Sequence, residues 1–466
     1  MIFSGIPFLY FFLPAVILLY AVSPTKLKNA VLLAANIFFY AWGERLLALV
    51  FIGSILLGWA LGLLIAKFRG KPAARAFLTV SVLADLGLLG YFKYTDFFIS
   101  NFNSLTGMSV PLLKIALPIG ISFYTFQILS YTVDVYRGTV RAQKNLINFA
   151  LYVSLFPQLI AGPIVRYCDV EEQLSRHTHS VESTADGISR FAVGLGKKVL
   201  LANVFGELCT SFRGTSDPSV LFFWLYAASF MLQIYFDFSG YSDMAIGLGK
   251  MFGFTFMENF NYPYVSASIT EFWRRWHISL GSWFRDYVYI PLGGNRKGIA
   301  KQMRNILIVW FLTGFWHGAA WNFIFWGLFY AALLLAEKLW LKKFLDSHKA
   351  IGHIYVLFAV LLGFVLFNAA DLSQLTDDVS GLLGLKGVPL ISAETLYFLR
   401  SYGFTIIIGI IGCTPLPKLA VQSLGKKKLP AAVLEIAEPV GVLLLLLAVT
   451  AYLVDGSFNP FLYFRF

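Results

Sequence analysis

Charged residues are scarce in this sequence. Only 13% of the 466 residues are Asp, Glu, Lys or Arg, whereas 58% are hydrophobic. A soluble domain carries about 25% charged residues. Apolar runs of about 20 residues recur along the whole chain, and each is long enough to cross a bilayer as a helix. No long stretch alternates polar and apolar residues, which argues against a transmembrane β-barrel. We therefore expect an all-α polytopic integral membrane protein without a soluble domain.

Several common catalytic and metal-binding motifs are also missing. The three cysteines, Cys168, Cys209 and Cys413, are scattered without C-x-x-C spacing, so they predict neither a disulfide framework nor a metal site. The sequence has no G-x-S-x-G nucleophile elbow and no Walker-type phosphate loop. His277 and His317 lack a third ligand at supporting spacing. We expect no metal and no permanently bound cofactor.

The apolar runs divide the chain into candidate membrane spans. The first run has no basic residue before it and no small-residue cleavage site, so we expect a retained span rather than a signal peptide. The expected spans are residues 7–22, 29–43, 46–66, 76–94, 115–133, 146–165, 187–206, 219–236, 305–327, 328–341, 352–369, 399–415 and 438–454.

Positive charge is concentrated in short loops between these runs. The net charge of +12 would suit a nucleic-acid-binding protein, but its distribution follows the positive-inside rule of membrane proteins. Basic residues follow the first, third and fifth runs and precede the last, whereas the loop between the second and third runs carries only Glu44 and Arg45. This alternation predicts that both termini are extracytoplasmic. We therefore expect the chain to contact membrane lipid and not to bind nucleic acid.

Residues 256–300 are the least lipid-like long stretch. Ser268 and Glu271 have the spacing of a capping box, which predicts a helix that begins near Thr270. Polar backbone at membrane depth is tolerated only where it is buried in protein or lines a cavity. The stretch is thus either a cytoplasmic interfacial structure or the re-entrant wall of a cavity. On one continuous helix, four residues would share a face: Trp273, His277, Leu280 and Phe284.

Basic and aromatic residues gather around His277. Arg274, Arg275 and Arg285, with Trp273, could receive the phosphates of an anionic donor such as a coenzyme A thioester. Plain positive-inside charge is the alternative interpretation of each arginine.

His317 lies in the tryptophan-rich run Phe315–Trp321. If the helix that opens near Ile306 continues through this run, one face would carry Trp310, Thr313, Gly314, His317, Ala320 and Trp321. Small residues there would admit a second helix or a thin substrate, and Trp316 would add a tunnel wall. A neutral imidazole suits a general base that takes a proton from a hydroxyl while the hydroxyl attacks a thioester. Structural hydrogen bonding across helices is the alternative.

Two further polar islands interrupt apolar runs. One runs from Pro157 to Arg166 and contains Gln158, and the other contains Asp237 and Asp243. Each is either tunnel lining or a helix break with local hydrogen bonds.

Four of these stretches together resemble the membrane-bound O-acyltransferase family, in its alginate O-acetyltransferase-like branch. They are Pro157–Arg166, Gln233–Gly247, Glu258–Arg296 and Phe311–Trp321. The aromatic tail, residues 456–466, and Ile121–Arg137 also resemble that branch. The likeness covers nearly the whole chain and is strongest over 115–330, which implies a single transmembrane acyltransferase domain over 1–466.

The resemblance implies a fold and a reaction. The family fold is a helical ring with re-entrant or interfacial helices around a cross-membrane tunnel. His317 matches the family's catalytic histidine, and His277 matches a second polar position on the same tunnel. Acetyl-CoA would be the donor on the cytoplasmic side of a bacterial (inner) membrane. The acceptor would be an exported polysaccharide, reached directly or through an extracytoplasmic partner protein.

Three alternatives stay open at this point. The family also contains transferases of D-alanine to teichoic acid, so another acyl group is possible. Ionisable residues within membrane spans also suit a transporter or channel, although no internal repeat is visible. A scaffold that gathers a secreted acetylation complex, with the aromatic tail as its contact, is the third alternative. The tail is otherwise an interfacial belt or a plug.

Overall fold

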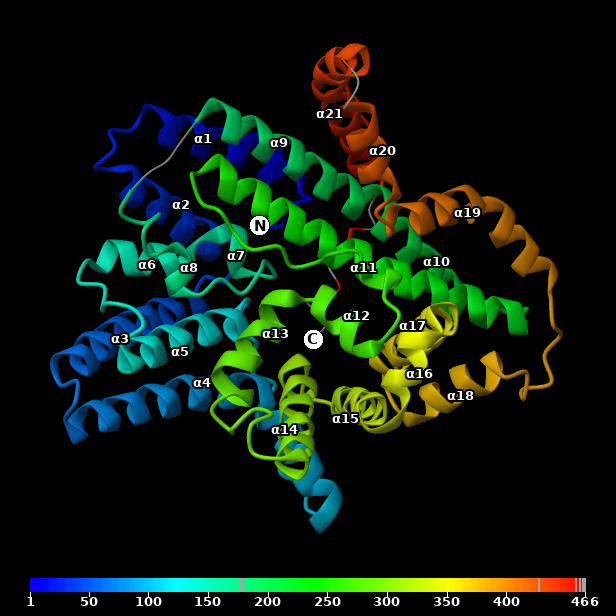
Figure 1. Cartoon of the computed structure of the whole chain (residues 1–466), viewed down its shortest axis with the longest axis horizontal. Helices are drawn as coiled ribbons and strands as arrows, with labels where there is room; N and C mark the ends of the chain where they lie inside the picture. Colours follow the sequence, from blue (N-terminus) through cyan, green and yellow to red (C-terminus); the bar gives the residue numbers. More distant parts are fainter. Residues whose placement is uncertain (177–179, 426–427, 457–458, 461, 463–466) are drawn as a thin grey trace. The chain divides into compact units, whose positions relative to one another are not determined.

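The computed structural model describes residues 1–176, 180–425, 428–456, 459–460 and 462. Apart from one isolated bridge between Phe260 and Trp276, the regular elements of this described part are helices. The chain forms two compact units, one of residues 1–191 with 244–257 (unit 1) and one of residues 192–243 with 258–466 (unit 2). Figure 1 shows the helices that each unit contains.

Unit 1 is built from the N-terminal helices. They are η1 (Phe8–Phe12), α1 (Leu13–Val22), α2 (Lys28–Gly43), α3 (Leu47–Lys67), α4 (Pro72–Thr106), α5 (Ile121–Arg137), α6 (Leu146–Ser154), α7 (Phe156–Leu159), α8 (Tyr167–Val170) and most of α9 (Val181–Gly196).

Unit 2 contains the remaining helices. They are η2 (Lys197–Ala202), α10 (Asn203–Arg213), α11 (Val220–Met251, to Asp243), η3 (Pro263–Val265), α12 (Ile269–Arg275), α13 (Ile278–Phe284), η4 (Arg285–Tyr289), α14 (Ile299–His317), α15 (Trp321–Ala336), η5 (Glu337–Leu341), α16 (Lys342–Ser347), α17 (Lys349–Asn368), α18 (Leu372–Leu382), α19 (Ala393–Gly412), α20 (Leu416–Gly425) and α21 (Lys428–Asp455).

Within the described residues, seven helices are long and apolar enough to cross a membrane. They are Leu47–Lys67, Pro72–Thr106, Val220–Met251, Trp321–Ser347, Lys349–Asn368, Ala393–Gly412 and Glu435–Asp455. This confirms the expected polytopic, all-helical class. Several other expected spans are shorter helices, such as the apolar stretch Phe8–Val22.

The expected span 146–165 is wrong. The α6 helix ends at Ser154, and Leu155 turns the chain before the short α7. Pro157 fits the first turn of α7, which begins at Phe156, because the N–H that proline lacks has no partner inside a first helical turn. Side chains supply hydrogen-bond partners for backbone groups at this interruption of the helix. The Phe156 N–H donates to Asn36 Oδ1 at 3.1 Å, and Gln158 Nε2 donates to the Tyr152 carbonyl at 2.5 Å.

The expected spans 305–327 and 328–341 also divide the chain in the wrong place. The α14 helix ends at His317, and the backbone is extended at Gly318 and Ala320 before α15 begins at Trp321. The α14 and α15 helices pack so closely that a Cβ added to Gly314 would strike the Phe323 carbonyl. A Cβ at Gly327 would meet the Trp310 carbonyl in the same way. The extended residues between α14 and α15 therefore connect the two helices of a tightly packed helical hairpin.

Candidate functional site

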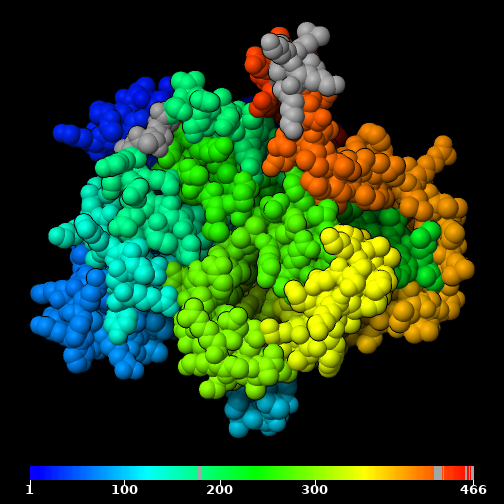
Figure 2. Space-filling model, in the orientation of Figure 1, coloured from blue at the N-terminus to red at the C-terminus, as the bar shows by residue number. Residues whose placement is uncertain are grey.

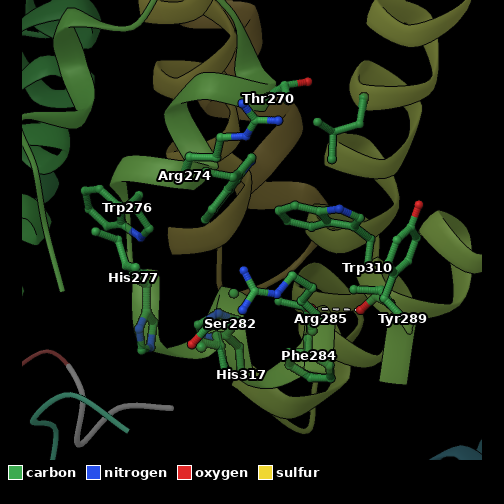
Figure 3. Close-up of a pocket in the computed structure, with 17 residues that line it drawn as sticks. Thr270, Arg274, Trp276, His277, Ser282, Phe284, Arg285, Tyr289, Trp310 and His317 are labelled. Carbon is green, nitrogen blue, oxygen red and sulfur yellow. Dashed lines mark hydrogen bonds between the residues drawn. The ribbon is translucent and has the colours of Figure 1, made fainter. Parts of the chain in front are cut away.

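Unit 2 holds a cavity of about 500 Å³. Its walls come from α12, α13, η4, α14 and α15, and Figure 2 shows a recess among these green and yellow-green segments. In Figure 3, Arg274, Trp276 and His277 lie on one side and Trp310 and Tyr289 on the other. The lining residues are Thr270, Trp273, Arg274, Trp276, His277, Ile278, Leu280, Gly281, Ser282, Phe284, Arg285, Tyr289, Val309, Trp310, Thr313, His317 and Leu334.

The α12 helix begins where the capping box predicts. The Ser268 side chain accepts from the Glu271 N–H at 3.1 Å. A second acceptor comes from α15's extension: the buried Glu337 carboxylate accepts from the backbone N–H groups of Ile269 and Thr270. A carboxylate at this end also complements the helix dipole. Glu337 therefore fixes α12 against the α15 side of the cavity.

The expected continuous helix through His277 is wrong. The α12 helix ends at Arg275, and an antiparallel pairing takes over: Asn261 N–H donates to the Arg275 carbonyl at 2.9 Å, and Ile278 N–H to the Asn259 carbonyl at 3.0 Å. His277 has φ +47° and starts a new helix, α13. A left-handed conformation costs a non-glycine residue about 1–2 kcal/mol. The surrounding pairing holds the histidine in that conformation.

The His277 imidazole is fixed in one tautomer. Its Nδ1 lies 3.2 Å from Asn259 Oδ1, an oxygen that also accepts from the Ser279 N–H and hydroxyl. Because an amide oxygen carries no hydrogen, Nδ1 is the donor in this contact and carries the ring proton. Nε2 therefore presents a lone pair. It is buried and has no hydrogen-bond partner among the described residues.

Burial keeps this imidazole neutral. His277 is 3% exposed and lies outside the candidate spans. Desolvation lowers its pKa to about 3, because a charged ring is disfavoured away from water. Its ring also meets the edge of Phe238, with centroids 4.7 Å apart.

His317 is held by aromatic rings. It is half-buried at the end of α14, and its ring makes edge contacts with Trp316 and Trp326, each at 5.1 Å between centroids, and with Phe367 at 5.4 Å. Trp316 also contacts His277, at 6.2 Å. One indole therefore lies against both imidazoles. A chain of ring contacts joins the two candidate histidines.

Only some of the residues expected to share a helix face with His317 do so in the structure. Trp310, Thr313 and His317 line the cavity from α14. Ala320 and Trp321 lie beyond the helix end, and Trp321 is 50% exposed on α15. Gly314 serves the contact with α15 instead of the cavity lining.

Two of the three candidate arginines reach the cavity. Arg274 and Arg285 line it, and Arg285 also pairs with Asp286 at 2.7 Å. Arg275 does not line it, because its guanidinium pairs with Glu271 at 2.9 Å and donates to the Asn261 carbonyl. Trp273 lines the wall and packs edge-on against Trp310 and Tyr330.

The remaining candidates lie away from this lining. Asp237 and Asp243 of α11 form ion pairs with Lys198 and Lys197, at 2.5 and 2.6 Å. Gln158 belongs to unit 1 and holds the α6–α7 break described above. Among the described residues, no group of three or more His, Cys, Asp or Glu side chains could hold a metal.

Asn259, Ser279 and Glu337 are the residues that sequence reasoning missed. Asn259 is 18 positions from the histidine that it orients, so no local period reveals it. Ser279 follows His277 by two positions, which was the available signal.

Comparisons with known proteins agree with this picture. The model of MBOAT, the membrane-bound O-acyltransferase family, matches residues 113–368, which include the whole cavity lining. The chain therefore belongs to the membrane-bound O-acyltransferase family and is a multi-pass membrane O-acyltransferase.

Three similar chains are named as O-acetylating enzymes. A probable alginate O-acetylase of Azotobacter vinelandii is 39% identical, over the full length of both chains. A probable alginate O-acetylase of Pseudomonas aeruginosa is 44% identical over 80% of this chain and 73% of its own. A peptidoglycan O-acetyltransferase of Helicobacter pylori is 34% identical over 87% of this chain and 84% of its own.

Proposed function

We propose that this chain transfers an acetyl group from cytoplasmic acetyl-CoA to an exported, alginate-like polysaccharide. The relatives' names support both the group and the acceptor class. One structural observation carries the proposal: a single cavity is lined by two histidines and two arginines that come from α12, the link between α12 and α13, η4 and α14. Exported polymer requires the acetyl group to cross the membrane, so we also propose the family's ring and tunnel, with extracytoplasmic termini.

His317 is the proposed general base. The acceptor hydroxyl oxygen attacks the thioester carbonyl carbon, and His317 takes the hydroxyl proton as the new C–O bond forms. The C–S bond then breaks, and the thiolate leaves as coenzyme A and regains a proton. A positioned base of this kind contributes about 10²–10⁴-fold to a rate.

His277 and the arginines are assigned to the donor side. The fixed Nε2 lone pair of His277 can accept a hydrogen bond from an amide N–H of the donor's pantetheine arm. Arg274 and Arg285 are exposed guanidinium groups at the cavity wall, which suits phosphate recognition. Either direct transfer or transfer through an extracytoplasmic partner protein fits this arrangement.

The test is acetylation of polymer in cells that make normal amounts of a His317→Ala variant. The expected result is loss of acetyl groups from the polymer. His348→Ala is a matched control, because His348 is exposed, its Nδ1 lies 3.1 Å from the Phe344 carbonyl and its ring stacks on Phe344, away from the cavity lining. Full acetylation by His317→Ala would refute the role of His317.

A second measurement separates transfer from transport. Purified wild-type protein in liposomes with labelled acetyl-CoA should yield labelled polymer or free coenzyme A. Movement of an ion or solute without any thioester cleavage would favour a transporter and refute the proposal. Offering alginate, peptidoglycan fragments and teichoic acid in parallel identifies the acceptor.

A further inference from the structure

Two helices of unit 2 approach closely at Gly240 of α11. A Cβ added there would lie 2.7 Å from the Gly194 carbonyl and 3.2 Å from the Lys198 amide nitrogen. The neighbouring chain is a π-helical stretch, η2, which often marks a functional place in a helix. Its adjacent lysines, Lys197 and Lys198, pair with Asp243 and Asp237 on either side of Gly240.

The Lys198–Asp237 pair is unusual because it is deeply buried. Each side chain is 3% exposed, and the charged atoms are 2.5 Å apart. Replacing such a pair by apolar residues is often neutral or stabilising, so stability alone does not account for it.

Both members of the pair also bind the end of the chain. Lys198 Nζ donates to the Pro460 carbonyl, and Asp237 Oδ2 accepts from the Leu462 N–H at 2.9 Å. Asn203 Nδ2 adds a bond to Asn459 Oδ1 at 3.2 Å. The Leu462 side chain is buried in the cluster that contains Tyr235 and Phe236. We call Asn459, Pro460 and Leu462 the C-terminal strap.

The docking point adjoins the site. Phe238 follows Asp237 on α11, and its ring contacts both His277, at 4.7 Å, and Phe260, at 5.0 Å. Phe260 in turn forms the bridge with Trp276, the residue before His277. A shift of α11 at Asp237 would therefore move the wall against which the His277 imidazole packs.

We propose that the C-terminal strap docks on the buried Lys198–Asp237 pair and thereby holds the α11 wall behind His277. Lys198 and Asp237 are then positioning residues for the acyl transfer, and the end of the chain is part of the site rather than an appendage. The positioning role rests on the proposed function, whereas the docking does not.

A charge swap distinguishes docking from a simple ion pair. In Lys198→Asp/Asp237→Lys the ion pair persists, but position 198 no longer has a donor for the Pro460 carbonyl and position 237 no longer has an acceptor for the Leu462 N–H. If the pair contributed only to stability, the swapped variant would keep the wild-type exchange rate at the Leu462 amide and the wild-type kcat. Docking predicts that it does not.

The first readout is hydrogen exchange at the Leu462 amide in the full-length protein in detergent. In the wild type this amide should exchange at least about tenfold more slowly than in the swapped variant, because its bond to a buried carboxylate must open first. Asp378→Asn is the control: it breaks another ion pair of unit 2, between the buried Asp378 carboxylate and the exposed Arg213, and among the described residues neither of them bonds the strap. Its Leu462 exchange should match the wild type.

The second readout is steady-state transfer. The swapped variant should lose about tenfold in kcat while the KM for acetyl-CoA stays within about twofold, because the fault lies in the alignment of the reacting groups. If the swapped protein fails to accumulate, Leu462→Pro serves instead, since it removes the N–H donor and leaves the pair intact. That variant has no amide at position 462, so its readout is kcat, which should fall as in the swapped variant.

Each outcome is decisive for one step. An unprotected Leu462 amide in the wild type overturns the docking. Lost protection with unchanged kcat overturns the positioning role. A protected amide in a wild-type protein that transfers no acyl group refutes the proposed function and leaves the docking standing.

Discussion

The two imidazoles of the cavity differ in the contacts that the structure shows around them. His277 is fixed by hydrogen bonds: Asn259 and Ser279 hold Nδ1, and backbone pairing holds the main chain. His317 is enclosed by the ring edges of Trp316, Trp326 and Phe367. The hydrogen bonds fix the orientation of the His277 ring, and the three aromatic rings restrict the position of the His317 ring. The proposed roles also differ: a hydrogen-bond acceptor at His277 and the general base at His317.

The strongest test of this contrast removes each imidazole separately. His317→Ala should lower kcat by about 10²–10⁴-fold, the contribution of a general base. His277→Ala should chiefly raise the KM for acetyl-CoA. Steady-state kinetics of both purified variants measure the split, and equal losses of kcat in both would contradict the assigned roles.

Releasing His277 from its anchor should have the next largest effect. Asn259→Ala removes the oxygen that fixes Nδ1, and misplacement of a binding group by about 1 Å can cost about 10²-fold in rate. Asn259→Asp keeps an acceptor at the same place and should retain more activity. Acyl transfer by the two variants, compared at equal protein amounts, measures the difference. Identical losses would mean that the acceptor oxygen is unimportant.

The packing behind His317 should respond to a single methyl group. Gly314→Ala places a Cβ against the Phe323 carbonyl, and overpacking of this kind costs about 1–3 kcal/mol. We expect a lower melting temperature in detergent and lower transfer activity. Gly87→Ala in α4 is the control, because no atom lies near its added Cβ. Unchanged melting of Gly314→Ala would show that α14 and α15 separate easily.

The smallest effect concerns acid stability. The pKa of His277 falls from 6.5 to about 3 on folding, so the unfolded chain binds more protons than the folded protein between these values. This contribution to stability is complete above pH 6.5 and falls by up to about 1.4 kcal/mol per pH unit below it. Melting curves between pH 5 and 7 should therefore flatten in His277→Gln. Parallel curves for the variant and the wild type would contradict the neutral buried ring.

Local sequence signals predicted much of the candidate site. The capping box placed the start of α12 correctly, and seven candidate residues were brought together at the cavity: Trp273, Arg274, His277, Arg285, Trp310, Thr313 and His317. The composition and length of the apolar runs were enough to predict a polytopic membrane protein, because a span must be both apolar and long enough to cross the bilayer. The roles of these residues stay predictions.

The helix ends could not be predicted because tertiary contacts set them. The α12 helix stops at Arg275 since residues 259–261 compete for its backbone groups, and α14 stops at His317 so that α15 can fold back on Gly314. Residues 259–261 and α15 reach these positions only in the folded protein. Extending the helical periodicity of α12 through His277, or that of α14 beyond His317, therefore predicts the wrong neighbours for each histidine.

The bridge between Phe260 and Trp276 has a consequence for redesign of the enzyme. It places His277 through main-chain groups, which remain whatever side chains surround them. Val309 of α14 and Leu334 of α15, in contrast, line the cavity away from this pairing. Substitutions at these two positions would therefore alter the volume of the cavity while the main-chain pairing keeps the imidazole in place.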